Sequence, residues 1–225
     1  MEDESTSEKK QFRHRLIQEE FRSILGSPEY KVPVDTQGVV ALSAPPVKDE
    51  NGTVIDEASP ENKERIGFSV EVIRQIVAQK LGKNAGEITD NDILNNAPPL
   101  ILNGETEQLL AMAEIAQKLG FPGEKIELID CGKRGIGNTQ TQFEAINNDP
   151  RFENFINLTF VSSDYHVPRV IRTGDKNLRS QIHFDVLPVP HDRISYNVFR
   201  VVRGEVRRIE KYSENGDIAR TPIPR

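Results

Sequence analysis

The chain has 225 residues, of which 36% are hydrophobic and 28% are charged, and this length and composition fit one globular domain with a sizeable core. Its formal net charge of -6 excludes a surface that attracts nucleic acid or an anionic membrane through its average charge, because phosphate groups would repel it. We therefore expect no nucleic-acid and no membrane partner, while a local basic pocket stays compatible with the acidic total.

The N-terminal residues and the cysteine content indicate the cellular compartment. The N-terminal sequence MEDESTSEKK is hydrophilic where a secretion signal needs an apolar stretch, and no run of about 18 apolar residues occurs. The single cysteine, Cys131, has no second cysteine for an internal disulfide, which fits a reducing compartment. We expect a soluble, cytoplasmic protein.

Residues 1–36 predict an extension that precedes the main domain. We expect residues 1–10 to be disordered and residues 27–36, with two prolines, to be a linker. Between them, apolar residues at helical spacing up to Gly26 predict an amphipathic helix that docks on another surface. A second copy of the chain is one candidate for that surface, which would give a homo-oligomer. The apolar residues of this helix are Phe12, Leu16, Phe21, Ile24 and Leu25.

Residues 37–225 predict one domain in which strands and helices alternate five times. Strands are expected at residues 38–42, 99–102, 125–129, 158–161 and 183–187. Helices are expected at residues 65–81, 105–119, 139–147, 167–177 and 194–212. Such alternation is typical of an α/β fold, in which helices cover both faces of a mainly parallel sheet, here with five strands.

Two predicted connections are longer than this fold class prefers. Residues 43–62 contain an Asn51-Gly52 turn followed by the apolar run Thr53-Val54-Ile55, and they predict a hairpin over the strand ends, for which a lid is one interpretation. Residues 82–98 lead from a helix back to a strand at the opposite edge, and we expect them to be structural only.

Small, polar and titratable residues follow the carboxyl end of every predicted strand. In chain order these are Ser43; Asn103, Gly104 and Glu107; Gly132, Asn138 and Thr139; Ser163, Asp164 and His166; and His191, Asp192 and Arg193. Open parallel sheets bind ligands outside this edge, where helix N-termini present unpaired amides and partial positive charge. The sequence predicts a binding site at this rim, although strand-to-helix turns also use such residues as caps.

The turn CGKRGIGNTQ, residues 131–140, is rich in glycine. It matches neither the P-loop pattern, which ends in Gly-Lys-Ser/Thr, nor the dinucleotide-binding Gly-x-Gly-x-x-Gly spacing. Its glycines let the backbone approach a ligand, and Asn138 or Thr139 can cap the next helix; capping alone explains the same residues. Lys133 and Arg134 are either solvated or close over an anion.

The stretch SSDYHVPRV, residues 162–170, carries the sharpest site pattern. Pro168 fits the first turn of a helix, so that Ser163 or Asp164 is the expected cap. His166 and Arg169 are three positions apart and face the same way beside a helix N-terminus, which favours an anion. The alternative is structural: Arg169 pairs with a neighbouring carboxylate, and His166 is packed.

The longer stretch VSSDYHVPRV resembles the Val-Thr-Ser-Asp-Tyr-His-x-Pro-Arg-Ala signature of the YdcF/SanA/ElyC-like bacterial family, a domain of unknown function. Four further features agree in order: GVVALS, Arg65 at a helix start, LILNGETEQLLAMAEIAQKLGFPGEKIEL and GNTQTQFEAI. The resemblance covers residues 38–212. It departs from the family at Ser43-Ala44-Pro45-Pro46, where a glycine-rich turn is usual, and at Thr141-Gln142, where Glu-Asn is usual.

The resemblance implies a Rossmann-like three-layer sandwich with its site at the switch point between the first and fourth strands. Some members of the family are linked to envelope maintenance in bacteria, and S-adenosylmethionine binding within the family makes that molecule a candidate ligand. The resemblance indicates no general reaction. The shared positions are Arg65, Gly104, Glu107, Asn138, Thr139, Ser163, Asp164, His166 and Arg169.

The first of three functional hypotheses is a binder of, or enzyme for, a nucleotide-like or phosphorylated small molecule. Thr139, Ser163 and Arg169 would hold the anion. His166 would act as acid or base, with Glu107 orienting it or a substrate hydroxyl. The remaining residues expected in the site are Ser43, Arg65, Asn103, Gly104, Asn138 and Asp164.

The other two hypotheses are a phosphoester hydrolase or transferase and a noncatalytic interaction module. Hydrolysis would use Ser163 or Thr139 as nucleophile, without the Gly-x-Ser-x-Gly elbow. The four histidines have no metal-ligand spacing, so we expect no metal. An interaction module would use the N-terminal helix and the final helix, although the charges from Arg200 to Lys211 are more typical of a solvated face.

Overall fold

A computed structural model describes residues 14–15, 17–25, 30–132, 138–190 and 198–219 of the chain. Five parallel strands form the central sheet in the order β5-β4-β1-β6-β7. The strands are β1 (Gly38–Leu42), β4 (Leu100–Gly104), β5 (Ile126–Asp130), β6 (Asn157–Ser163) and β7 (His183–Val189). The predicted α/β fold is confirmed. The strand order also has the expected switch point, which lies between β1 and β6, the first and fourth strands of this sheet along the chain.

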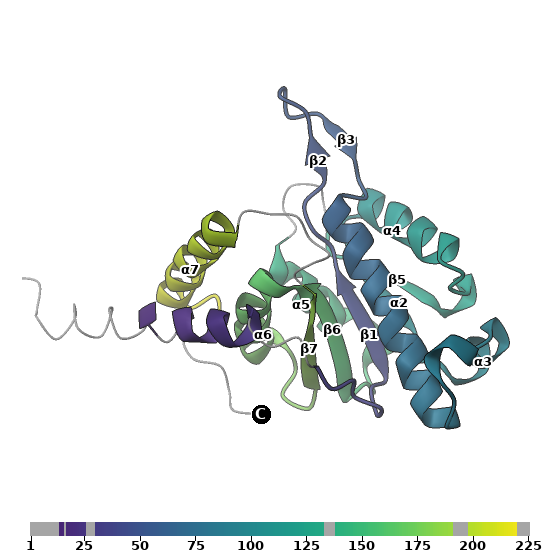
Figure 1. The fold of residues 1–225 in the computed structure, drawn as a ribbon. Coiled ribbons are helices and arrows are strands. Elements are labelled where there is room, and N and C mark those ends of the chain that lie inside the picture. Colours follow the sequence, from purple (N-terminus) through teal and green to yellow (C-terminus); the bar gives the residue numbers. More distant parts are fainter. Residues whose placement is uncertain (1–13, 16, 26–29, 133–137, 191–197, 220–225) are drawn as a thin grey trace, which may run out of the picture.

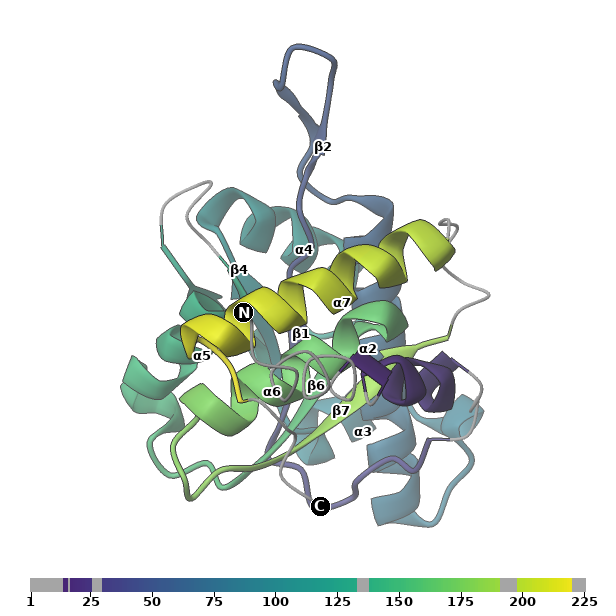
Figure 2. The ribbon, with the colours of Figure 1, turned by 90° about the vertical axis from the view of Figure 1, so that its left-hand side faces the viewer.

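Helices cover both faces of this sheet (Figure 1). One face carries α2 (Pro60–Leu81), α3 (Asp90–Asn96) and α4 (Thr106–Lys118), and the other carries α5 (Thr139–Asn148) and α6 (Val167–Asn177). The last helix, α7 (Val198–Asn215), lies outside α6 in both views (Figures 1 and 2). The arrangement is a Rossmann-like three-layer sandwich, as expected. Short 3₁₀ turns are η1 (Ala85–Glu87), η2 (Gly123–Lys125), η3 (Pro150–Phe152) and η4 (Asp164–His166).

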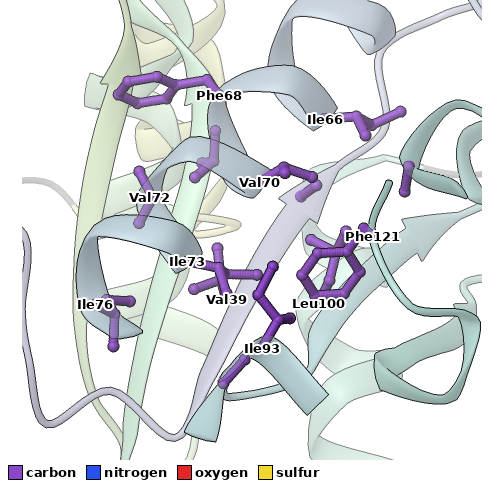
Figure 3. Close-up of a cluster of buried hydrophobic side chains, with 14 of the residues drawn as sticks. Val39, Ile66, Phe68, Val70, Val72, Ile73, Ile76, Ile93, Leu100 and Phe121 are labelled. Atoms are coloured by element: carbon purple, nitrogen blue, oxygen red, sulfur yellow. The ribbon is translucent and has the colours of Figure 1, made fainter. Parts of the chain in front are cut away.

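The core follows from the alternation of side chains along β1. Val39 points to the face covered by α2, α3 and α4, whereas Val40 points to the face covered by α5 and α6, and both are fully buried. On the first face, Val39 and Leu100 pack against Ile73 of α2 and Ile93 of α3 (Figure 3).

The first turn of α2 and the short helix α3 were not predicted from apolar periodicity, and both begin at a polar capping residue. Helix α2 begins at Pro60 rather than at residue 65, because the Ser59 side chain accepts a hydrogen bond from the Asn62 amide at 3.3 Å and Pro60 fits the first turn. Residues 82–98, which we expected to be only a connection, contain η1 and α3, and Thr89 caps α3.

The predicted hairpin in residues 43–62 is present. Strands β2 (Val47–Lys48) and β3 (Val54–Asp56) pair antiparallel and project from the body of the protein in both views (Figures 1 and 2). Ile55 in this hairpin is 64% exposed. The tip of the hairpin thus projects away from the body and does not fold over the strand ends as a lid, while its base, with Pro45, Pro46 and Lys48, stays close to them.

The N-terminal helix docks within the same chain. Its described residues 17–25 place Ile17 and Phe21, which are 5% and 2% exposed, against Val206 and Ile209 of α7. Of the five apolar residues predicted for this helix, Phe21 is buried and Ile24 and Leu25 are half-buried, whereas Phe12 and Leu16 lie outside the described residues. Part of the apolar face that we offered to a second copy is thus covered within the chain, and the homo-oligomer stays a prediction. The expected disordered tail, residues 1–10, lies outside the described residues.

The segment expected to be a linker also packs on the domain where it is described. Val32 is 4% exposed, and the ring of Tyr30 lies edge-on to Phe68 with centroids 5.0 Å apart. Among the described helices, none combines the length and the apolar character needed to cross a membrane.

Close packing on the α6 side predicts a large effect for one glycine. A Cβ atom on Gly174 of α6 would overlap the ring of Phe184, which packs among other phenylalanines, so we expect Gly174→Ala to lower the free energy of unfolding by about 1–3 kcal/mol. Gly67 of α2 is the matched control, because a Cβ there meets nothing within 4 Å. Gly67→Ala should be neutral or stabilise by up to about 1 kcal/mol. Equal urea midpoints for the two variants would contradict this packing.

Candidate functional site

A cavity of about 360 Å³ opens at the carboxyl edge of the sheet, at the switch point between β1 and β6. Its walls come from the turns after β1, β4 and β6, from the start of α5 and from α7. The basic side chains that line it are Lys48, Arg65, Arg169 and Arg208. The acidic ones are Glu105 and Glu205.

One wall is formed where the N-terminus of α5 meets α6. Asn138 is the N-cap of α5, since its Oδ1 accepts from the Thr141 amide at 3.0 Å, and this leaves the Thr139 hydroxyl to face the cavity. Arg169 Nη1 donates to Thr139 Oγ1 at 2.8 Å, and His166 Nε2 lies 3.3 Å from the same oxygen. The prediction that His166 and Arg169 face the same way is confirmed.

The His166 imidazole is held on both sides. Its Nδ1 lies 2.9 Å from Ser162 Oγ, and the ring is 5% exposed. Burial, together with the positive charges of Arg169 and Arg65, lowers the pKa of His166 well below 6.5. The imidazole is therefore neutral near pH 7. In this state it can donate one hydrogen bond and accept another, or take up a proton, but it adds no positive charge to the site.

Arg65 connects the ends of the two central strands. Its Nη1 donates to the carbonyl of Leu42 at the end of β1 at 2.8 Å, and its Nε donates to Ser163 Oγ at the end of β6 at 3.0 Å. The side chain is 2% exposed and forms an ion pair with Glu61 at 3.1 Å. Arg65 thus reaches the cavity wall with most of its donors already committed to the protein.

Glu61 supports the cavity wall from behind and was not predicted from the sequence. Its carboxylate accepts hydrogen bonds from Ser163 Oγ and Tyr165 Oη and faces Arg65. Burial raises the pKa of Glu61, but the Arg65 charge and these hydrogen bonds outweigh it, and the net shift is below 4.5. Burial and the Glu61 charge raise the pKa of Tyr165, which stays protonated. The residue was missed because it lies in the polar first turn of α2, outside the predicted helix.

Glu205 of α7 is a second residue that was missed. The sequence placed it on a solvated face, but its side chain is 1% exposed and accepts from Arg169 Nε at 2.7 Å and from Arg208. The alternating charges along α7 do not reveal from the sequence which side of the helix faces the cavity. The structural alternative for Arg169, pairing with a carboxylate, is also confirmed, and it coexists with the contact to Thr139.

Six of the predicted site residues line the cavity and five do not. The lining ones are Ser43, Arg65, Asn138, Thr139, His166 and Arg169. Glu107 is exposed on α4 and does not line the cavity, so the expected role of orienting His166 has no structural basis. Its neighbours Glu105 and Gln108 line the cavity instead, as the N-cap and third residue of α4, which form a capping box.

The other four predicted residues lie behind the cavity wall. Asn103 is fully buried and donates to the Gln142 carbonyl at 2.8 Å. Gly104 allows close packing of the Ser43 side chain, which a Cβ would overlap, rather than approach of a ligand. Ser163 and Asp164 do not cap α6, since the η4 turn intervenes and His166 occupies the N-cap position.

Several predicted features fall outside the described residues. Lys133, Arg134 and the rest of residues 133–137 belong to this group, as do His191, Asp192 and Arg193. Within the part of the chain that the structure describes, no cluster of His, Cys, Asp and Glu could hold a metal ion. Cys131 lines the cavity, but burial and the nearby carboxylates of Glu105 and Asp130 raise its pKa to about 11, so it is a thiol at neutral pH.

Comparison of the chain with protein-family models, with curated proteins and with solved structures found no match. The resemblance of VSSDYHVPRV to the YdcF/SanA/ElyC-like signature therefore stays a prediction.

The buried neutral His166 predicts a pH dependence of stability. Below about pH 6.5 the unfolded state binds a proton that the folded state excludes, so the free energy of unfolding should fall on acidification by up to about 1.4 kcal/mol per pH unit. In His166→Gln this contribution is absent, and urea unfolding between pH 7 and pH 5 should show a shallower slope than in the wild type. Identical slopes would show that the imidazole is protonated in the folded state.

Proposed function

We propose that the cavity binds a small molecule through a phosphate or a similar oxyanion. The observation that carries the proposal is the contact of Arg169 Nη1 with Thr139 Oγ1, 2.8 Å long, at the N-terminus of α5 inside the cavity. A guanidinium and a hydroxyl at a helix N-terminus form a site for negative charge, because the helix dipole and the unpaired amides add to the arginine charge.

Two features of the chain support an anion at this place. Among the described residues, four basic and two acidic side chains line the cavity, so the lining is more basic than the chain as a whole, whose net charge is -6. Arg169 also has donors to spare, since its contacts with Glu205 and Thr139 use three of its five N–H groups.

The size of the cavity favours a metabolite rather than a polymer. Its volume of about 360 Å³ is at the lower end of the range typical of small-molecule sites. A nucleotide-like or phosphorylated ligand is the class that we favour. S-adenosylmethionine belongs among the candidates, because its carboxylate and its cationic groups have counterparts in the basic and acidic residues of the lining.

Binding should be visible as thermal stabilisation and should depend on Arg169. We expect at least one of AMP, cyclic AMP, glucose 6-phosphate and S-adenosylmethionine to raise the melting temperature. Loss of a charge-assisted hydrogen bond should weaken that ligand at least about tenfold in Arg169→Gln, while Arg207→Gln, on the exposed part of α7, keeps wild-type affinity. Thr139→Val is a second variant, because it removes the hydroxyl but leaves the pair with Glu205. No stabilisation by any of these anions, or full affinity in both site variants, would refute the proposal.

A phosphoester hydrolase or transferase is the second candidate function. It is favoured by the chain of contacts from Thr139 Oγ1 through His166 to Ser162 Oγ, at 3.3 and 2.9 Å. A neutral imidazole can take the proton of the Thr139 hydroxyl as its oxygen attacks phosphorus, and Arg169 would stabilise the developing charge on that oxygen. The bond to the leaving alcohol then breaks, the alcohol receives the proton, and water releases the phosphoryl group in a second step.

This candidate predicts turnover of a chromogenic ester. Bis(p-nitrophenyl) phosphate or p-nitrophenyl phosphate should release p-nitrophenol, and Thr139→Val and His166→Gln should each lower kcat at least about a hundredfold. Thr139→Ser, which keeps a hydroxyl, should retain most of the rate. Turnover that survives in Thr139→Val would exclude Thr139 as the nucleophile.

A further inference from the structure

Glu205 places a fixed negative charge in the wall of the proposed anion site. Its carboxylate lies 2.7 Å from Arg169 Nε and also accepts from Arg208 Nη1, and it is 1% exposed, whereas Arg208 is 55% exposed. The residue comes from α7, which crosses in front of α6 (Figure 2). Glu205 therefore occupies one side of the Arg169 guanidinium and leaves its Nη1 edge facing Thr139 and the cavity.

Among the described residues around the cavity, carboxylates offset much of the arginine charge. Glu61 offsets Arg65, and the single carboxylate of Glu205 is shared by two arginines. Burial keeps His166 neutral. Among the described residues that line the cavity, Lys48, Arg65, Arg169 and Arg208 carry positive charge and Glu105 and Glu205 carry negative charge, while Glu61 lies behind the wall against Arg65.

A doubly charged ligand bound to Arg169 Nη1 would lie on one side of the guanidinium, with the Glu205 carboxylate on the other side. Like charges a few ångströms apart repel strongly when the medium around them is mostly protein, since water screens them poorly there. A singly charged oxyanion can use the Nη1 edge with less of this repulsion, since it carries half the charge.

We propose that Glu205 is a specificity-determining residue that makes the cavity prefer singly charged oxyanions, with a phosphodiester as the ligand class, over doubly charged phosphomonoesters. The inference rests on the proposed function, because it assumes that an anion binds at Arg169 and Thr139. It gives α7 a role in the site in addition to its packing against the N-terminal helix.

Two probes that differ by one methyl group test the charge preference. At about pH 8, phenyl phosphate is a dianion and methyl phenyl phosphate is a monoanion. Calorimetric titration of the full chain should give an affinity about tenfold higher for the diester. Glu205→Gln removes the repulsion between Glu205 and the dianion. The ratio of the affinity for the diester to that for the monoester should therefore fall at least about tenfold.

Variants of Arg208 separate charge from positioning. Arg208→Gln is expected to fold, because this side chain is mostly exposed, and it should move the ratio further toward the diester. The double variant E205Q/R208Q restores the wild-type charge, so its ratio should return toward the wild-type value. A ratio in the double variant equal to that of E205Q alone would mean that Glu205 acts only by positioning Arg169, which overturns the charge argument.

The remaining outcomes are also decisive. A wild-type preference for phenyl phosphate, or a ratio that neither Glu205→Gln nor Arg208→Gln changes, overturns the inference while leaving the anion site in place. Absence of binding of either probe to the wild type and to every variant refutes the proposed anion site itself, and the inference with it.

Discussion

The site depends on one buried guanidinium. In the strand order β5-β4-β1-β6-β7, the connections after β1 and β6 lead to helices on opposite faces of the sheet, and Arg65 spans this point by binding the Leu42 carbonyl and the Ser163 hydroxyl. Leaving a buried arginine without a carboxylate is costly, and Glu61, from the same helix, supplies it. This pair fixes the turn after β6, and with it the positions of His166 and Arg169, so the geometry of the cavity follows from a contact that is itself structural.

A second ion pair sets the outer wall. Arg169 is held between Glu205 on α7 and Thr139 at the start of α5. The helix that carries Glu205 is anchored through a small core of its own with the N-terminal helix, separate from the two cores that flank the sheet. The N-terminal helix therefore stabilises the site indirectly, because whatever loosens it also loosens the carboxylate beside Arg169.

The sequence predicted the parts of the molecule that follow from local patterns. The strand at residues 38–42 and the helix at residues 167–177 have the predicted bounds, since a short buried apolar run and a proline in the first turn mark them clearly. Glu61 and Glu205 were not predicted, because each is buried by a tertiary contact that leaves no periodic signal. Glu107 was placed in the site by its position after the second predicted strand and by the resemblance, but it lies exposed in the first turn of α4 and does not line the cavity.

Binding of an oxyanion at the N-terminus of α5 beside Arg169 underlies both proposals. The most direct measurement is a ¹H–¹⁵N NMR titration with methyl phenyl phosphate that follows the backbone amides of Thr139 and Gln140 and the side-chain Nε–H of Arg169. We expect saturable shifts at these three groups, while resonances of the projecting β2–β3 hairpin tip stay unchanged. Saturable shifts confined to other regions, or no shifts at these groups at any concentration, would contradict this binding.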